Sequence, residues 1–133
     1  MKYLLDTNIL DDLAKRPDGE ARRRLAALEP SAVCTSIIVV AEVRYGFAKR
    51  PSAKLEAAVA AILATIDVIP FDDPADRSYG IIRAELEQAG TQIGPNDLII
   101  AAQALALGLI VVTDNEREFR RVPGLLVENW LRA

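Results

Sequence analysis

The chain has 133 residues, of which 51% are hydrophobic and 26% are charged, and its net charge is −3. This length predicts a single domain over residues 1–133, and the high apolar content favours a second buried surface, so we expect a homodimer or a bound partner. The sequence has no histidine, which excludes Ser-His-Asp and Cys-His catalysis and the usual zinc sites.

The cysteine content and the apolar stretches exclude further classes of site and of protein. Cys34 is the only cysteine, so an internal disulfide is excluded, and its apolar surroundings predict that it simply packs. Asp6 interrupts the first apolar run, which argues against a signal peptide, and the apolar stretch 98–112 is too short to span a membrane. We therefore expect a soluble, cytoplasmic protein that uses carboxylates, hydroxyl groups, Lys or Arg, together with a hard metal ion.

In chain order, the sequence predicts twelve elements from its apolar periodicity, capping residues and breakers. They are strand 3–5, helix 9–14, helix 18–28, strand 32–35, helix 37–48, helix 53–64, strand 67–70, helix 72–88, helix 98–107, strand 109–112, a short helix 116–119 and strand 126–127. Because strands alternate with helices, we expect an α/β fold in which helices flank a parallel sheet.

The first strand ends at Asp6, where open parallel sheets place their chemistry. Thr7 or Asn8 can cap a helix that begins near Ile9, and a purely capping role for Asp6 and Thr7 is a competing interpretation. The choice depends on which other acidic residues lie near Asp6.

Basic residues are concentrated in the first half of the chain. Between residues 15 and 54 the chain has nine of its sixteen basic residues and four of its nineteen acidic residues. Each basic side chain alone is expected to be solvated on a helix face, but together they form a candidate phosphate-facing region. The nine residues are Lys15, Arg16, Arg22, Arg23, Arg24, Arg44, Lys49, Arg50 and Lys54.

The helix at 37–48, capped by Ser36, is apolar on nearly all sides, as is typical of a buried helix. Glu42 lies too far into this helix to form a capping box with Ser36, and a buried carboxylate needs a partner. A salt bridge to a neighbouring Arg and a metal or catalytic role are both compatible with the sequence.

Further acidic residues occur at helix and strand ends. Asp72 and Asp73 suit a helix N-terminus and are interpreted as structural. Asp97, in the first helical turn after Pro95, is either a favourable charge at the helix dipole or a rigidly held ligand. Asp114 follows the strand 109–112, so we expect it to open on the same crevice as the end of the first strand.

If Asp6, Glu42, Asp97 and Asp114 meet, they form a site of oxygen ligands with a high negative charge. Such a site requires protons or hard cations, and Mg²⁺ or Mn²⁺ fits best. Metal ions held by a few carboxylates serve phosphoryl chemistry.

The motifs around these acids resemble the PIN-domain ribonucleases of the VapC toxin type, the ribonuclease half of type II toxin–antitoxin pairs. They occur in the family's order and cover nearly the whole chain. The matching segments are Leu4-Leu5-Asp6-Thr7-Asn8, Thr35-Ser36 with Ala41-Glu42 and Gly46, Asn96-Asp97-Leu98-Ile99-Ile100-Ala101-Ala102, Thr113-Asp114-Asn115 with Phe119, and a tail with Val122-Pro123-Gly124-Leu125 and Glu128-Asn129-Trp130.

The resemblance implies a PIN-like three-layer α/β/α sandwich with a mostly parallel central sheet, usually dimeric. Asp6, Glu42 and Asp97 match the family's acidic triad. Asp114 is expected to fill the fourth acidic position, with Asn115 as the alternative.

Four polar neighbours are expected to support the carboxylates or orient a water. They are Thr7, Asn8, Thr113 and Asn115.

The resemblance also implies the reaction and the partners. We expect hydrolysis of single-stranded or looped RNA by metal-activated water, with Mg²⁺ as the metal and Mn²⁺ as the alternative, giving a 5′-phosphate and a 3′-hydroxyl. The basic region is expected to hold the RNA backbone, and a VapB-type antitoxin is the expected protein partner.

Other functions are alternatives to a toxin. A chromosomal RNA-processing PIN nuclease fits the same acids, although the compact chain favours the toxin. A non-catalytic PIN-fold interaction module is disfavoured because the triad is complete. A receiver or dehalogenase-like phosphoryl enzyme is disfavoured because no lysine follows Lys54.

Overall fold

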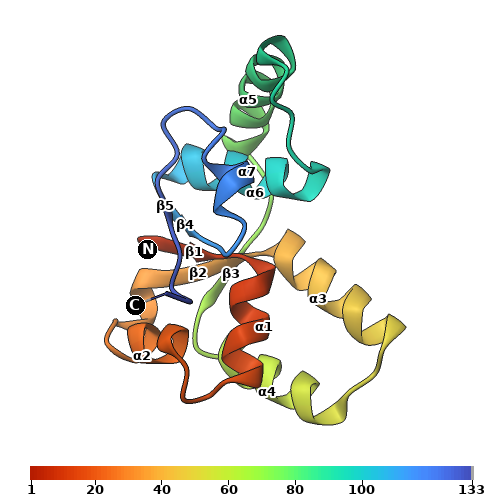
Figure 1. Ribbon diagram of the computed structural model, residues 1–133, viewed down its shortest axis with the longest axis vertical. Coiled ribbons are helices and arrows are strands. Elements are labelled where there is room, and N and C mark those ends of the chain that lie inside the picture. Colours follow the sequence, from red (N-terminus) through yellow and green to blue (C-terminus); the bar gives the residue numbers. More distant parts are fainter. Residues whose placement is uncertain (133) are drawn as a thin grey trace.

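The computed structural model describes residues 1–132 as a five-stranded sheet with helices on both faces (Figure 1). The strands are β1 (Tyr3–Leu5), β2 (Val33–Ser36), β3 (Asp67–Ile69), β4 (Ile110–Val112) and β5 (Val127–Glu128). The helices are α1 (Thr7–Lys15), α2 (Glu20–Ala26), α3 (Ile37–Lys49), α4 (Ala53–Leu63), α5 (Ala75–Ala89), α6 (Pro95–Leu107) and α7 (Glu116–Phe119), and a 3-10 turn spans Pro30–Ala32.

The strand order is β3-β2-β1-β4-β5, and every pairing in the sheet is parallel. In the central strand, Leu4 lies opposite Cys34 of β2 on one side and Val111 of β4 on the other. The chain proceeds outward from β1 to β3 and then returns to the far side of β1. The winding direction therefore reverses between β1 and β4, which is where doubly wound sheets open a crevice.

This reversal distributes the helices over the two faces, because parallel crossovers keep one hand. Figure 1 shows α1, α2 and α4 below the sheet and α5, α6 and α7 above it, with α3 running outward from the end of β2. The three-layer α/β/α sandwich predicted from the sequence is confirmed.

The middle of the sheet is apolar on both faces. Leu4, Leu5, Val111 and Val112 have no exposed surface, as expected for parallel strands covered by helices on both sides. The chain's last segment also joins the core, because Trp130 is 2% exposed and its ring meets the Tyr3 ring edge-on at 5.3 Å.

Four helices begin two or three residues from their predicted starts, among them α6, which begins at Pro95 instead of Leu98. Helix α1 begins at Thr7 instead of Ile9, because the Asp6 side chain is the N-cap and accepts from the Thr7 amide. Helix α2 is shorter than predicted at both ends. Helix α5 begins at Ala75 instead of Asp72, because Pro74 disfavours a helical conformation at the residue before it.

Helix α3 is not the buried helix that its composition predicts. Val39 and Val40 are buried, but Ile37 is 44% exposed and Tyr45 is 66% exposed. The prediction was wrong because α3 extends beyond the sheet, so only one of its sides finds partners. The predicted cap is confirmed, since Ser36 Oγ accepts from the Ile38 amide at 3.0 Å.

A buried polar side chain connects α6 to the start of α3. Gln103 of α6 has no exposed surface, and its Oε1 accepts a hydrogen bond from the Ser36 hydroxyl. Its Nε2 donates to the Pro70 carbonyl at 3.0 Å and to the Ile69 carbonyl at 3.4 Å. All hydrogen-bonding groups of this amide are therefore used inside the core, which fixes α6 against β3 and the α3 cap.

Cys34 is fully buried in β2, and burial raises the pKa of its thiol to about 11, so it packs as an inert side chain. Among residues 1–132, no helix combines the length and apolarity needed to cross a membrane.

Candidate active site

A cavity of about 450 Å³ lies at the edge of the sheet where β1 and β4 end. The first turns of α3 and α6 are close to the same edge. Asp6, Glu42 and Asp97 all line it, together with Asn115. The three carboxylates come from the end of β1, the second turn of α3 and the first turn of α6. Residues far apart in the sequence thus meet at the point where the sheet reverses its winding.

Asp6 lines the cavity and is only 4% exposed. Its Oδ1 accepts from the Thr7 amide at 2.8 Å, and its Oδ2 accepts from Thr113 Oγ1 at 2.8 Å and from Asn8 Nδ2 at 3.4 Å. Burial raises the pKa of Asp6, the hydrogen bonds from Thr113 and Thr7 oppose this rise, and the negative charge of Glu42 adds to it.

Glu42 is half-buried on the side of α3 that faces Asp6. Its Oε1 accepts from Thr7 Oγ1 at 2.6 Å. None of the ion pairs found among residues 1–132 includes Glu42, so the salt bridge that offered an alternative explanation is not observed there.

Asp97 and Glu118 share one donor. Asn115 Nδ2 donates to Asp97 Oδ2 at 2.9 Å and to Glu118 Oε2 at 2.5 Å, while Glu118 Oε1 accepts from the Gly94 amide at 2.8 Å. Burial, contact with Glu118 and the charge of Asp6 raise the pKa of Asp97 to about 8. Hydrogen bonds from Asn115 and Asp97 lower the pKa of Glu118. The contact thus favours the protonated form of Asp97 and the ionised form of Glu118.

Glu118 is a carboxylate of this cluster that the sequence reasoning missed. Helix α7 is one turn long, and Glu118 lies three residues after Asn115, so both side chains extend on the same side of the chain. That spacing, read together with the alternative position Asn115, was the available signal.

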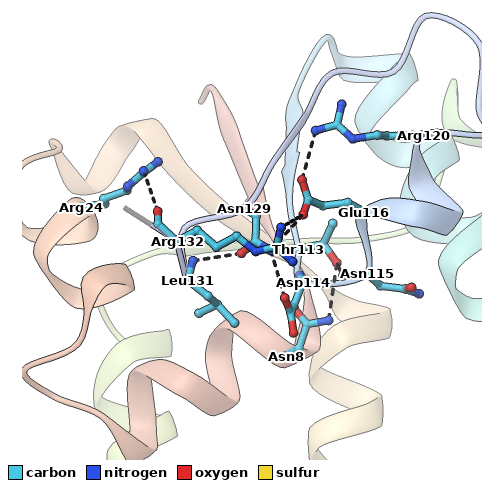
Figure 2. Close-up of polar contacts among 10 residues, drawn as sticks. All are labelled: Asn8, Arg24, Thr113, Asp114, Asn115, Glu116, Arg120, Asn129, Leu131 and Arg132. Carbon is cyan, nitrogen blue, oxygen red and sulfur yellow. Dashed lines mark hydrogen bonds and ion pairs between the residues drawn. The ribbon is translucent and has the colours of Figure 1, made fainter.

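Asp114, the residue expected to supply the fourth acid, does not line the cavity. Its carboxylate is exposed and accepts from Asn129 Nδ2 at 3.0 Å, and its backbone amide donates to Asn8 Oδ1 at 2.9 Å. Figure 2 shows the side chains of Asp114 and Asn115 leaving the loop in different directions. Thr113 and Asn115 therefore face the carboxylates, and Asp114 faces outward.

The tail of the chain holds this loop from outside (Figure 2). Asn129 Nδ2 donates to Asp114 Oδ1 at 3.0 Å and to Glu116 Oε2 at 3.1 Å, and Asn129 Oδ1 accepts from the Leu131 amide at 2.9 Å. Glu116 is also paired with Arg120 at 3.1 Å and with Arg132 at 3.6 Å. One amide side chain of the tail thereby contacts both Asp114 in the loop and Glu116 at the start of α7.

The predicted basic region does not form one continuous surface at the site. Of its nine members only Lys15 and Arg50 line the cavity. Lys15 is paired with Asp11 at 3.0 Å, and Arg23 and Arg24 are both paired with Glu20.

The cavity suits a hard cation in charge and in ligand type. Its carboxylates offer oxygen ligands, and their mutual repulsion is one reason why the pKa of Asp97 is high. As the side chains stand, no three Cys, Asp or Glu residues within the described part of the chain are grouped closely enough to hold a metal ion. Ligation would therefore require the carboxylates to close on the ion.

Comparisons with known proteins identify the family of the chain. The family model described as PIN domain matches residues 3–125. The chain is 37% identical to Ribonuclease VapC2 of Rickettsia felis and 39% identical to the tRNA(fMet)-specific endonuclease VapC of Salmonella typhimurium, each over 98% of both chains.

Solved structures give the same result for the fold. The crystal structure of VapBC2 from Rickettsia felis, bound to a DNA fragment from its promoter, has a TM-score of 0.89 at 34% identity, covering 98% of this chain and 99% of that chain. The structure of DNA-bound VapBC from Salmonella typhimurium has a TM-score of 0.84 at 37% identity, covering 98% of both chains. The chain therefore belongs to the PIN-domain family, as an endoribonuclease of the VapC type.

Proposed function

We propose that this chain is a Mg²⁺-dependent endoribonuclease toxin and that Asp6, Glu42 and Asp97 hold the cation. PIN-domain nucleases depend on metal ions, and Mg²⁺ is the divalent ion that best suits a few carboxylates and a phosphate substrate. The observation that carries the proposal is the meeting of three carboxylates from β1, α3 and α6 in one cavity at the switch point of the sheet.

Hydrogen bonds from neighbouring residues orient these carboxylates and favour the ionised form of Asp6. Thr113 and the Thr7 amide donate to Asp6 and favour its ionised form, and the Thr7 hydroxyl orients Glu42. Asn8 accepts from the Asp114 amide while it donates to Asp6, so it joins the start of α1 to the end of β4. When bound, the cation supplies positive charge that lowers the pKa of a nearby water and offsets negative charge on the phosphate.

The Asp97–Glu118 pair controls a proton at the edge of the site. Burial and the neighbouring carboxylates raise the pKa of Asp97 and so favour its protonated form, and a cation would favour release of the proton. Asn115 keeps the two carboxyl groups adjacent by donating to both. We assign Asn115 and Glu118, in place of Asp114, to the fourth position of the site.

The partners follow from the relatives. VapC proteins are named as ribonucleases, and the solved VapBC structures contain the paired toxin and antitoxin. We infer that RNA is the substrate, that a VapB-type antitoxin binds this chain, and that cleavage takes place in the cytoplasm, where RNA is abundant. The transfer-RNA specificity in the name of the Salmonella relative makes transfer RNA the first substrate to test.

Cleavage of total bacterial transfer RNA by the purified chain tests the function. We expect cleavage with Mg²⁺, none with EDTA, and a decrease in kcat of about 1000-fold or more for Asp6→Asn and for Asp97→Asn, because each removes one charged oxygen ligand. Calorimetry should show weaker Mg²⁺ binding by the same variants.

Asp114→Asn is the matched control, because it changes an equivalent charge on the same loop outside the cavity. We expect it to retain cleavage within about threefold. Undiminished cleavage in EDTA, or by Asp97→Asn, would contradict the proposed function.

A further inference from the structure

Three residues at and just after α3, Glu42, Gly46 and Arg50, line the cavity in a row. Glu42 and Gly46 are about one turn apart on one side of the helix, and Arg50 is the C-cap residue that follows α3 with a non-helical backbone. The cavity continues along this row away from the carboxylates. The cavity is therefore longer than the cation site alone requires.

Gly46 in the middle of this row is not explained by the packing of the chain. It is within α3, where alanine is more favourable than glycine, and its φ is not positive. A Cβ placed on Gly46 meets no atom within 4 Å. A glycine here weakens the helix and leaves open space in the cavity, which indicates that a ligand approaches the α3 backbone closely at this point.

The space beside Gly46 has an apolar wall and a cationic end. Phe47 of α3 and Leu55 and Val59 of α4 line this part of the cavity, and Phe47 is half-buried. The ion pairs found among residues 1–132 do not include Arg50, so its guanidinium is available to an anion from outside the chain. An aromatic wall next to a free guanidinium suits a nucleotide, whose base stacks and whose phosphate pairs.

We propose that this groove binds the nucleotide adjacent to the cut phosphate. The RNA backbone passes over Gly46, the base stacks on Phe47, and the next phosphate pairs with Arg50. This assignment rests on the ribonuclease function proposed above. It requires an unpaired strand at this position, because a base within a duplex has no free face to stack on Phe47.

Substitutions of Gly46 test the groove, and Gly80 supplies the matched control. Gly80 also lies within a helix, α5, also has no atom within 4 Å of a Cβ, and does not line the cavity. We expect Gly46→Ala and Gly80→Ala to raise the melting temperature similarly, by about 3 °C. Only at Gly46 should the substitution weaken RNA binding.

The readouts are the Kd of a fluorescent mixed-sequence single-stranded RNA, and KM and kcat for its cleavage. We expect Kd and KM to rise about 10-fold for Gly46→Ala and about 100-fold for Gly46→Leu, with kcat and Mg²⁺ affinity unchanged, because the substitutions displace the strand and not the carboxylates. Gly80→Ala and Gly80→Leu should leave all four quantities unchanged.

Phe47 provides an independent variant. Phe47→Leu keeps the apolar volume but removes the ring, so we expect it to raise Kd about 10-fold. Phe47→Leu should also change the base preference next to the cut, read by sequencing RNA 5′ ends.

The possible outcomes separate this inference from the function on which it rests. Equal Kd values for Gly46→Leu and Gly80→Leu would overturn the groove assignment and leave the nuclease function intact. Normal RNA binding by Gly46→Leu with lost binding of the neighbouring antitoxin would also overturn it, since the groove would then belong to the antitoxin. Failure of the wild type to cut any RNA contradicts the function alone, because binding is measured separately.

Discussion

Asp6 combines two contacts that first looked like alternatives. Its Oδ1 accepts from the first amide of α1 and so caps the helix, while its Oδ2 accepts from Thr113 and faces the cavity. A carboxylate has two oxygens with several lone pairs, so capping does not remove its capacity to bind a cation. Helix capping and cation binding at this residue are compatible for that reason.

Asp97 makes the stability of the cation-free protein depend on pH. Its pKa of about 8 in the folded chain exceeds its ordinary value of 3.8, so the folded state retains a proton that the unfolded chain releases. Between these two values the unfolded chain binds fewer protons, and the free energy of unfolding should therefore fall as pH rises from 5 to 8. Urea denaturation in EDTA at several pH values measures this slope.

Asp97→Asn should flatten that slope, since the amide does not titrate. Glu118 does not obscure the result, because its pKa is lowered from 4.5 and lies below the pH range used. Saturating Mg²⁺ should reverse the trend in the wild type, because the cation binds the ionised carboxylate. Identical slopes for the wild type and Asp97→Asn would place the proton elsewhere.

At the scale of elements, the loop between β4 and α7 depends on the tail of the chain. Thr113 and Asn115 contact the carboxylates from inside this loop, and Asn129 holds Asp114 and Glu116 from outside. We expect Asn129→Ala to destabilise the fold by about 1 kcal/mol and to lower kcat about tenfold with little change in KM. RNA cleavage kinetics and urea denaturation measure the two effects.

Arg132→Ala is the control for this effect. It removes an exposed ion pair to the same Glu116, at 3.6 Å, and such pairs contribute little. Equal losses of kcat in Arg132→Ala and Asn129→Ala would mean that the loop is not positioned through the Asn129 amide.

The sequence predicted which elements exist better than it predicted which way their residues face. The order of strands and helices follows from periodicity and capping residues, which are local properties. The exposure of α3 depends on how far it extends beyond the sheet, which no local pattern encodes. Asp114 was preferred for its charge, yet the direction of a side chain after a strand is set by the path of the loop, and this path points Asn115 inward.

For the whole molecule, the exposed side of α3 bears on assembly. Ile37, Ala41, Tyr45 and Ala48 form an exposed, mostly apolar row on the side of α3 opposite Gly46. An uncovered apolar row favours association, in line with the homodimer or bound partner expected from composition. We expect Tyr45→Glu to shift the protein from dimer to monomer in sedimentation velocity experiments.

Leu126→Glu supplies the comparison for this prediction, because Leu126 is similarly exposed, at 63%, but lies outside α3. It should leave the dimer intact. A wild-type monomer, or a Tyr45→Glu dimer, would exclude this row as the interface.

The position of the site could be predicted without the exact strand order, because the carboxyl ends of parallel strands share one edge. The order β3-β2-β1-β4-β5 depends on long-range pairing and was not accessible from one sequence. It nevertheless explains why Asp6 and the loop after β4 are adjacent, since β1 and β4 are neighbours.

The side-chain amide of Gln103 connects α6, the helix that carries Asp97, to the start of α3, the helix that carries Glu42. It accepts from the hydroxyl that caps α3, and it is part of the helix on which Asp97 sits. If a cation draws Glu42 and Asp97 together, both α3 and α6 shift, and the hydrogen bond between Ser36 and Gln103 changes with them. The side-chain amide resonances of Gln103 should therefore shift on Mg²⁺ addition and exchange slowly with solvent, so that a residue deep in the interior reports by NMR on occupancy of a site it does not touch.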